Sequence, residues 1–134
     1  MKEIEVAAAI IVTKENGEDR LLAVQRGYGD LIGKWEFPGG KLEPNETGRQ
    51  AVVREIREEL GVDIEVDSFL ATIEYDYPTF HLKMHCYICS TTDTIKLTEH
   101  QAMKWCKKNE LRDLDWCPAD IQVVSLLDTC KYLP

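Results

Sequence analysis

The chain has 134 residues and a formal net charge of −8, a length that suits one domain built on one hydrophobic core. No basic patch of the kind that binds nucleic acid is visible, and the longest apolar run, Val6 to Val12, is too short to cross a bilayer. We therefore expect a single soluble domain spanning residues 1-134, with no nucleic acid and no membrane as partner. Oligomeric state is left open.

The cysteine content predicts a reducing compartment. An odd number of cysteines, without the basic-then-apolar layout of a signal peptide at the amino terminus, favours free thiols and a cytoplasmic location. Cys86 and Cys89 form a C-x-x-C pair, but in a strand positions three apart point to opposite faces. No second such pair completes a zinc site, so we expect both thiols to be structural.

The amino-terminal third predicts strands joined by turns. Glu5 to Lys14 is apolar and β-branched, Glu15 to Glu18 is typical of a turn, and Arg20 to Arg26 continues as a second strand, so we predict a hairpin. After a glycine-rich loop, Trp35 to Phe37 predicts a short strand that ends in a turn at Pro38-Gly39-Gly40.

The middle of the chain predicts one helix and two long strands. The helix is expected over 46–60, with Asn45 as its N-cap and Gly61 as its stop. Ile64 to Tyr75 and Phe80 to Ser90 are the predicted strands on either side of Pro78. Apolar and polar residues alternate in the second strand, which indicates one apolar face.

The carboxyl-terminal third predicts a short strand at Ala102 to Trp105, a helical turn at Asn109 to Asp113 and a terminal helix from Pro118 to Leu133. Ile121, Val124 and either Leu127 or Asp128 are expected on one face of that helix. Together these elements predict an α+β fold, an α/β/α sandwich with a mixed β-sheet between helices.

The helix over 46–60 gathers acids on one side. At about 100° per residue, Glu58 and Glu59 fall within about 60° on either side of Glu55. Three carboxylates this close repel one another, and a cation is the simplest compensation. Oxygen ligands favour Mg²⁺ or Mn²⁺ over zinc. The alternative is a solvated acidic face paired with Arg54 and Arg57.

A longer pattern includes these acids. Gly40 is followed after five residues by Glu46 and after seven more by Arg54-Glu55-Ile56-Arg57-Glu58-Glu59-Leu60-Gly61-Val62. This segment resembles the Nudix box, G-x5-E-x7-R-E-U-x-E-E-x-G-U with U a bulky aliphatic residue, at every position. The resemblance covers nearly the whole chain. Segments 35–41 and 74–78 resemble MutT-type Nudix members, and segments 4–11, 99–102, 105–106 and 118–121 resemble the CTP pyrophosphohydrolase branch most.

The resemblance implies the Nudix fold and a Mg²⁺-dependent pyrophosphohydrolase that splits a nucleoside triphosphate into monophosphate and pyrophosphate, with Mn²⁺ able to substitute. It implies a metal site, held by these residues: the Gly39 carbonyl, Glu55, Glu58, Glu59 and Glu99. Either Glu55 or Glu99 would be the base that deprotonates water, a choice left open. Arg54 would orient Glu55 or neighbouring acids, and Glu46 would be structural. The number of metal ions is also open.

Four further residues are expected to bind the substrate. Lys41 and Arg26 are the expected phosphate contacts, although a plain surface role is the alternative for Arg26. Phe37 matches a base-contacting position of the MutT-type pattern. Asp120 lies where enzymes selective for an oxidised guanine carry Asn. An ionised aspartate only accepts hydrogen bonds, and cytosine, like adenine-type bases, offers an amino donor, which favours CTP, dCTP or a modified form such as 5-methyl-dCTP. The alternative for Asp120 is that it merely caps the terminal helix.

The sequence also admits other assignments. An oxidised purine substrate of the 8-oxo-dGTP type is the runner-up. Pro78 falls 16 residues beyond Val62 (78 − 62), a mark of some ADP-ribose-cleaving members, but MutT-type members share it. A non-enzymatic sensor would be expected to lose box carboxylates, and all are present. His81 and His85 share a strand face without a third ligand, so we expect a polar face there.

Overall fold

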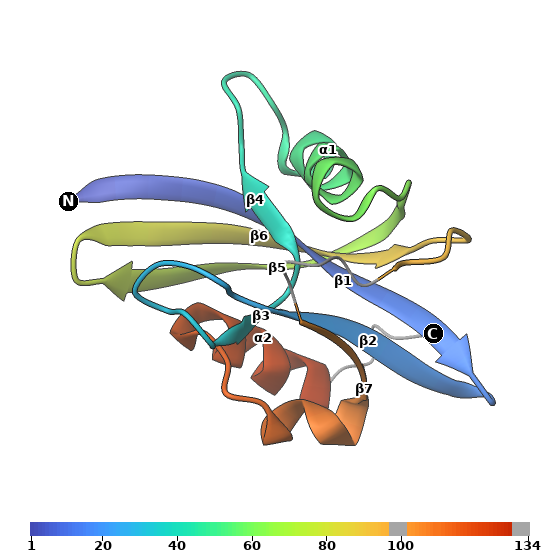
Figure 1. The fold of residues 1–134 in the computed structure, drawn as a ribbon. Coiled ribbons are helices and arrows are strands. Elements are labelled where there is room, and N and C mark those ends of the chain that lie inside the picture. The colour runs from blue at the N-terminus through green and yellow to red at the C-terminus, as the bar shows by residue number, and fades with distance from the viewer. Residues whose placement is uncertain (97–101, 130–134) are drawn as a thin grey trace.

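The computed structural model describes residues 1–96 and 102–129 (Figure 1). Its elements, in chain order, are strands β1 (Lys2–Glu15), β2 (Glu18–Gln25), β3 (Trp35–Glu36) and β4 (Gly39–Lys41), helix α1 (Gly48–Leu60), strands β5 (Glu65–Tyr77), β6 (Phe80–Ser90) and β7 (Met103–Lys107), a 3₁₀ helix η1 (Lys108–Asp113) and helix α2 (Pro118–Asp128). No helix among the described residues is long and apolar enough to cross a membrane.

The described strands form one mixed sheet in the order β3-β2-β1-β6-β5, with β4 paired to β1 and β7 paired to β2. Strands β1 and β6 are parallel, with Val6 opposite Met84, and the other pairs are antiparallel. Helix α1 packs on β1 and β4, and α2 packs on β5 (Figure 1). The helices cover opposite faces of the sheet, so the predicted α+β sandwich is confirmed.

A hydrophobic cluster lies on each face of the sheet. Side chains alternate along a strand, so Ile10 packs in the cluster that contains the apolar side of α2, and Ile11 packs in the cluster under α1. Cys86 and Cys89 separate in the same way, one into each cluster. The cysteines of the described chain, Cys86, Cys89, Cys106 and Cys117, are all free and buried, as the sequence predicts.

Two predicted turns have different outcomes. The β1–β2 hairpin is present, and Asn16 and Gly17 both adopt positive φ angles (52° and 79°), which a two-residue hairpin turn of type I′ requires. The turn predicted at Pro38-Gly39-Gly40 is confined to a bend at Pro38, and its two glycines are not part of it. Gly39 and Gly40 lie in β4, opposite Ala8 and Ala7 of β1, because residues without side chains let the two backbones pair closely under α1.

The helix boundaries also differ from the prediction. The N-cap of α1 is Thr47, not Asn45, because Thr47 forms a reciprocal capping box with Gln50 while Asn45 takes a left-handed φ of 66° in the preceding loop. The predicted stop at Gly61 is confirmed, with φ 68°. In α2, Ile121 is 51% exposed instead of buried, since the helix turns Ala119, Val123 and Leu127 toward the sheet.

Candidate active site

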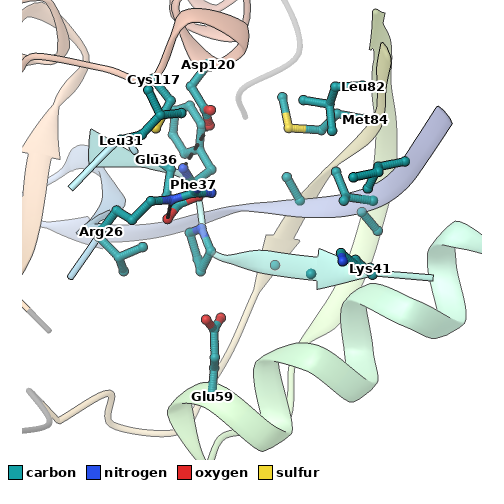
Figure 2. Close-up of a pocket in the computed structure, with 18 of the residues that line it drawn as sticks. Arg26, Leu31, Glu36, Phe37, Lys41, Glu59, Leu82, Met84, Cys117 and Asp120 are labelled. Carbon is teal, nitrogen blue, oxygen red and sulfur yellow. Dashed lines mark hydrogen bonds and ion pairs between the residues drawn. The ribbon is translucent and has the colours of Figure 1, made fainter. Parts of the chain in front are cut away.

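A cavity of about 340 Å³ joins the glycine pair of β4 to the first turn of α2. One side is an apolar wall from β1 and β6 that includes Leu82 and Met84, and the opposite side carries polar side chains from the ends of β2 and β3 (Figure 2). Most of the residues expected to contact metal or substrate line this one cavity: Arg26, Phe37, Gly39, Lys41, Glu59 and Asp120. Residues from five elements or their adjoining loops thus meet in a single space.

The α1 end of the cavity carries the acids. Glu59 extends from α1 toward the glycines of β4 (Figure 2). Glu55, one turn earlier, lies against Gly40, where a Cβ atom would sit 2.4 Å from the Glu55 carboxyl carbon and one of its oxygens. The absence of a side chain at Gly40 is therefore what lets the Glu55 carboxylate rest on β4. Ala51, Val52 and Ile56 bury the neighbouring face of the helix and fix its rotation.

Arg54 donates hydrogen bonds to acidic side chains on α1 and on the loop that precedes it. Its Nε and Nη2 atoms donate to the two oxygens of Glu46, both at 2.8 Å, and Nη2 also donates to the Lys41 carbonyl at 3.0 Å. Its Nη1 atom donates to Glu55 at 2.8 Å and to Glu58 at 3.2 Å. One edge of the guanidinium therefore ties α1 to the preceding loop, and the other edge contacts the acids expected to bind metal. The hydrogen bond to Arg54 lowers the pKa of Glu46 to about 2.

The donor chemistry here fits a hard divalent cation. The candidate ligands are carboxylate oxygens of α1 and backbone oxygen of β4, and the cradle at Gly40 is shaped to hold a carboxylate. In the described part of the chain, however, no three acidic, histidine or cysteine side chains are gathered closely enough to hold an ion. Glu58 is 60% exposed and turned to Arg54. Glu99 lies outside the described residues.

The opposite end of the cavity is formed by Asp120 and Phe37. Asp120 is 5% exposed, and its Oδ1 atom accepts a hydrogen bond of 3.0 Å from the backbone N–H of Phe37. The Phe37 ring stacks on Trp116, with centroids 4.7 Å apart. Burial raises the pKa of Asp120 to about 7, while the Phe37 N–H acts in the opposite direction. Near neutral pH, Asp120 can therefore carry a proton or lack one.

The two expected phosphate contacts have different surroundings. Lys41 lines the cavity at the β4 end. Arg26 lines it too, but its guanidinium forms two hydrogen bonds to Glu36, at 3.0 Å and 2.8 Å. Glu36 is not among the residues that the sequence predicts for the site. Strand β3 pairs with β2 so that Glu36 lies opposite Val24, and this pairing brings Glu36 close to Arg26, just after the end of β2. A prediction of this strand pairing would have identified Glu36.

Tyr77 is a second cavity residue that the sequence does not predict for the site. Its hydroxyl accepts a hydrogen bond of 3.3 Å from the backbone N–H of Ala119, and its ring stacks on Phe80, with centroids 5.0 Å apart. The hydroxyl thus attaches the β5–β6 hairpin to the first turn of α2. The sequence predicts that this strand ends at Tyr75, whereas β5 continues two residues further, to Tyr77, and so brings the Tyr77 side chain to the cavity.

The two histidines lie outside the cavity on the polar face of β6. His81 contacts Asp76 and Glu74, and His85 contacts Glu5 and Thr72. Each imidazole therefore has partners on neighbouring strands, as expected for a polar sheet face. The contacts to Asp76 and Glu74 raise the pKa of His81 above its ordinary value.

Comparisons with known proteins agree with this geometry. The model of the NUDIX domain family matches residues 3–127. The chain is 40% identical over 125 residues to a CTP pyrophosphohydrolase of Escherichia coli (strain K12), covering 92% of this chain and 90% of that protein. It is 33% identical over 130 residues to an 8-oxo-dGTP diphosphatase of the same strain, covering 95% and 98%. The solution structure of the E. coli ORF135 protein superimposes with a TM-score of 0.78 at 38% identity, covering 98% of this chain and 93% of that one. The chain therefore belongs to the NUDIX domain family and is a Nudix hydrolase.

Proposed function

We propose that this Nudix hydrolase cleaves CTP, dCTP or a modified cytosine nucleotide to the monophosphate and pyrophosphate, with Mg²⁺ as cofactor and Mn²⁺ as a substitute. The observation that carries the proposal is the position of Asp120. A buried carboxyl group stands at one end of a cavity whose other end holds Glu59 and the glycines of β4. A nucleotide bound along the cavity would have its base at Asp120 and its phosphates at the acids of α1.

The phosphate end has the groups that hydrolysis needs. Glu55, Glu58 and Glu59, with the Gly39 carbonyl and Glu99, would hold the metal, which when bound neutralises phosphate charge and activates water. Lys41 would bind a phosphate oxygen from the β4 side. Arg54 holds Glu55 in place through its Nη1 atom, and either Glu55 or Glu99 would take the proton from water.

The base end distinguishes pyrimidines by the protonation of Asp120. An ionised Asp120 accepts from the amino group of cytosine, whereas uracil and thymine present a carbonyl oxygen at that position, which would leave the carboxylate unpaired. A protonated Asp120 can donate to that carbonyl. Selectivity for cytosine should therefore rise with pH as Asp120 ionises around pH 7. An unpaired buried acceptor costs about 1–3 kcal/mol, which corresponds to roughly fivefold to 150-fold in kcat/KM.

The test compares kcat/KM for CTP, dCTP, UTP and dTTP between pH 6 and pH 9, reading pyrophosphate release. We expect the CTP/UTP ratio to exceed about ten above pH 8 and to fall toward pH 6. In Asp120→Asn, which does not titrate, the ratio should be smaller and independent of pH, while the metal requirement is unchanged. Equal hydrolysis of CTP and UTP by the wild type at all pH values would show that Asp120 does not read the base.

The products provide a separate test. Hydrolysis in ¹⁸O-labelled water, followed by mass spectrometry, should place the label in monophosphate or pyrophosphate. Inorganic phosphate as the primary product would contradict a pyrophosphohydrolase reaction. Any turnover also excludes a purely ligand-sensing role, for which a Nudix fold need not keep its box carboxylates.

An oxidised purine triphosphate is the second candidate. A protonated Asp120 offers one donor and one acceptor, which is what the asparagine of MutT-type enzymes selective for oxidised guanine offers at this position. The similarity to an 8-oxo-dGTP diphosphatase over nearly the full chain supports the same candidate. We include 8-oxo-dGTP and ADP-ribose in the substrate panel. A kcat/KM for 8-oxo-dGTP that exceeds that for CTP and increases as the pH falls would favour the purine.

The buried free cysteines fit a reducing compartment, and we propose that the enzyme acts in the cytoplasm. A tagged chain that fractionates with a secreted compartment would contradict this assignment.

A further inference from the structure

The polar wall of the cavity contains an ion pair beside Asp120. Arg26 Nε donates to Glu36 Oε2 at 3.0 Å and Arg26 Nη2 donates to Glu36 Oε1 at 2.8 Å, so both oxygens of the carboxylate are engaged by one guanidinium. The pair is only partly exposed, with side-chain accessibilities of 30% for Arg26 and 24% for Glu36. Figure 2 shows the pair and Asp120 on the same wall, across the cavity from Leu82 and Met84.

The backbone holds this wall in a fixed arrangement. The N–H of Trp35 donates to the Asp115 carbonyl and the N–H of Cys117 donates to the Trp35 carbonyl, both at 2.8 Å. Two residues later the N–H of Phe37 donates to Asp120. The backbone of segment 35–37 is therefore hydrogen-bonded to the start of α2. The side chain of Glu36, which lies between these contacts, pairs with Arg26.

We propose that Glu36 is a positioning residue for base recognition: by pairing with both nitrogens of the Arg26 edge, it prevents this guanidinium from pairing with Asp120 and so leaves an oxygen of Asp120 for the base. This inference rests on the proposed function, in which Asp120 contacts the base. Without Glu36, the guanidinium of Arg26 would lie unpaired beside the buried carboxyl group of Asp120. Arginine commonly binds a carboxylate through two parallel hydrogen bonds, so Arg26 would then pair with Asp120.

The two members of the ion pair, Glu36 and Arg26, shift the pKa of Asp120 in opposite directions. Glu36 raises the pKa of Asp120, and Arg26 lowers it. The other titratable neighbours are Tyr77 on β5, Cys86 on β6 and Cys117 before α2, and burial holds the pKa of each well above its ordinary value, so these three stay neutral. Glu59 and Lys41 line the same cavity nearer to β4. Among the groups on the wall with Asp120, Glu36 and Arg26 are the charged ones.

The experiment measures Asp120 directly in the full chain. The ¹³C shift of its carboxyl carbon, assigned by its loss in Asp120→Asn, is followed from pH 4 to pH 9 in the wild type, Glu36→Gln and Arg26→Gln. Glu36→Gln removes a negative charge and releases the cation, so the titration midpoint should fall by about one pH unit. Arg26→Gln removes the cation and leaves the anion, so the midpoint should rise. The matched control is Glu15→Gln, which removes an arginine-paired glutamate of β1 that does not line the cavity, and it should leave the midpoint unchanged.

Opposite shifts in the two variants would support the inference, because a merely structural disturbance of the pair would move both midpoints the same way. Shifts of the same sign, or no shift in either variant, would overturn it. A second readout is the CTP/UTP ratio across pH, whose transition should move with the midpoint in Glu36→Gln and vanish when Asp120→Asn is added. Opposite shifts combined with equal hydrolysis of CTP and UTP would refute the cytosine assignment alone. A strong cytosine preference without any shift would refute the role of Glu36 alone.

Discussion

Replacement of Gly40 by alanine tests whether the position of the Glu55 carboxylate matters to catalysis. The added Cβ would lie 2.4 Å from the Glu55 Cδ atom and one carboxylate oxygen and 2.9 Å from Cγ. Carbon atoms pack at about 3.5 Å or more, so the carboxyl group must move by about 1 Å. The atoms that must move are the far end of a flexible side chain, and the backbone around Gly40 need not change.

The expected cost differs sharply between stability and activity. Moving a part-exposed side chain away from its preferred rotamer costs about 1 kcal/mol, which lowers Tm by about 4 °C in a chain of this size. A displacement of about 1 Å in a group that holds metal or activates water costs on the order of a hundredfold in rate. Gly40→Ala should therefore fold nearly as well as the wild type and lose most of its kcat/KM.

The assay pairs thermal unfolding with pyrophosphate release and with calorimetric Mg²⁺ binding to the free enzyme. Gly39→Ala is the matched control, since its Cβ would lie 2.0 Å from the backbone oxygen of Ala7. Backbone pairing cannot yield as a side chain does, so this variant should lose about 3 kcal/mol or fail to fold. A Gly40→Ala enzyme with wild-type kcat/KM and Mg²⁺ affinity would refute the importance of the Glu55 position, and one as unstable as Gly39→Ala would refute the reasoning about the contact.

Two further outcomes are expected. Glu58→Gln removes one carboxylate charge from the proposed metal ligands at an exposed position, so kcat at saturating Mg²⁺ should fall about a hundredfold or more with Tm nearly unchanged; near-normal turnover would remove Glu58 from the metal site. Asp76 and Glu74 raise the pKa of His81, so their contribution to stability is fully present below the unfolded-state value of about 6.5 and is lost as pH rises through the folded value. The Tm difference between wild type and His81→Gln should therefore be larger at pH 6 than at pH 9, and a difference independent of pH would contradict the ionic origin.

Local signals predicted most of the fold. The hairpin of β1 and β2 follows from β-branched residues around Asn16-Gly17, and α1 follows from apolar spacing that ends at Gly61. The errors arose where contacts with residues distant in the sequence determine the local structure. Pro38-Gly39-Gly40 has the composition of a turn, and only the pairing of Gly39 and Gly40 with β1 makes them a strand. The exposed Ile121 of α2 likewise depends on where the helix meets the sheet, which apolar spacing alone does not specify.

The candidate site also has one part that local sequence spacing predicts and another part that depends on contacts between distant residues. The acids of α1 lie a few residues apart on one helix, so sequence spacing alone places Glu55 and Glu59 on one side, and the structure brings that side to β4. At the end of the cavity that holds Asp120, the residues Arg26, Glu36 and Asp120 come from separate parts of the chain, and their charges become linked only when β3 packs between β2 and α2. Burial at that junction also changes the chemistry of Asp120. The sequence suggests an ionised acid in the first turn of a helix, whereas the buried carboxyl group titrates near pH 7. A residue type and a motif position make Asp120 a candidate for base recognition, but its protonation depends on burial and on the opposing effects of Glu36 and Arg26, which only the folded structure brings together.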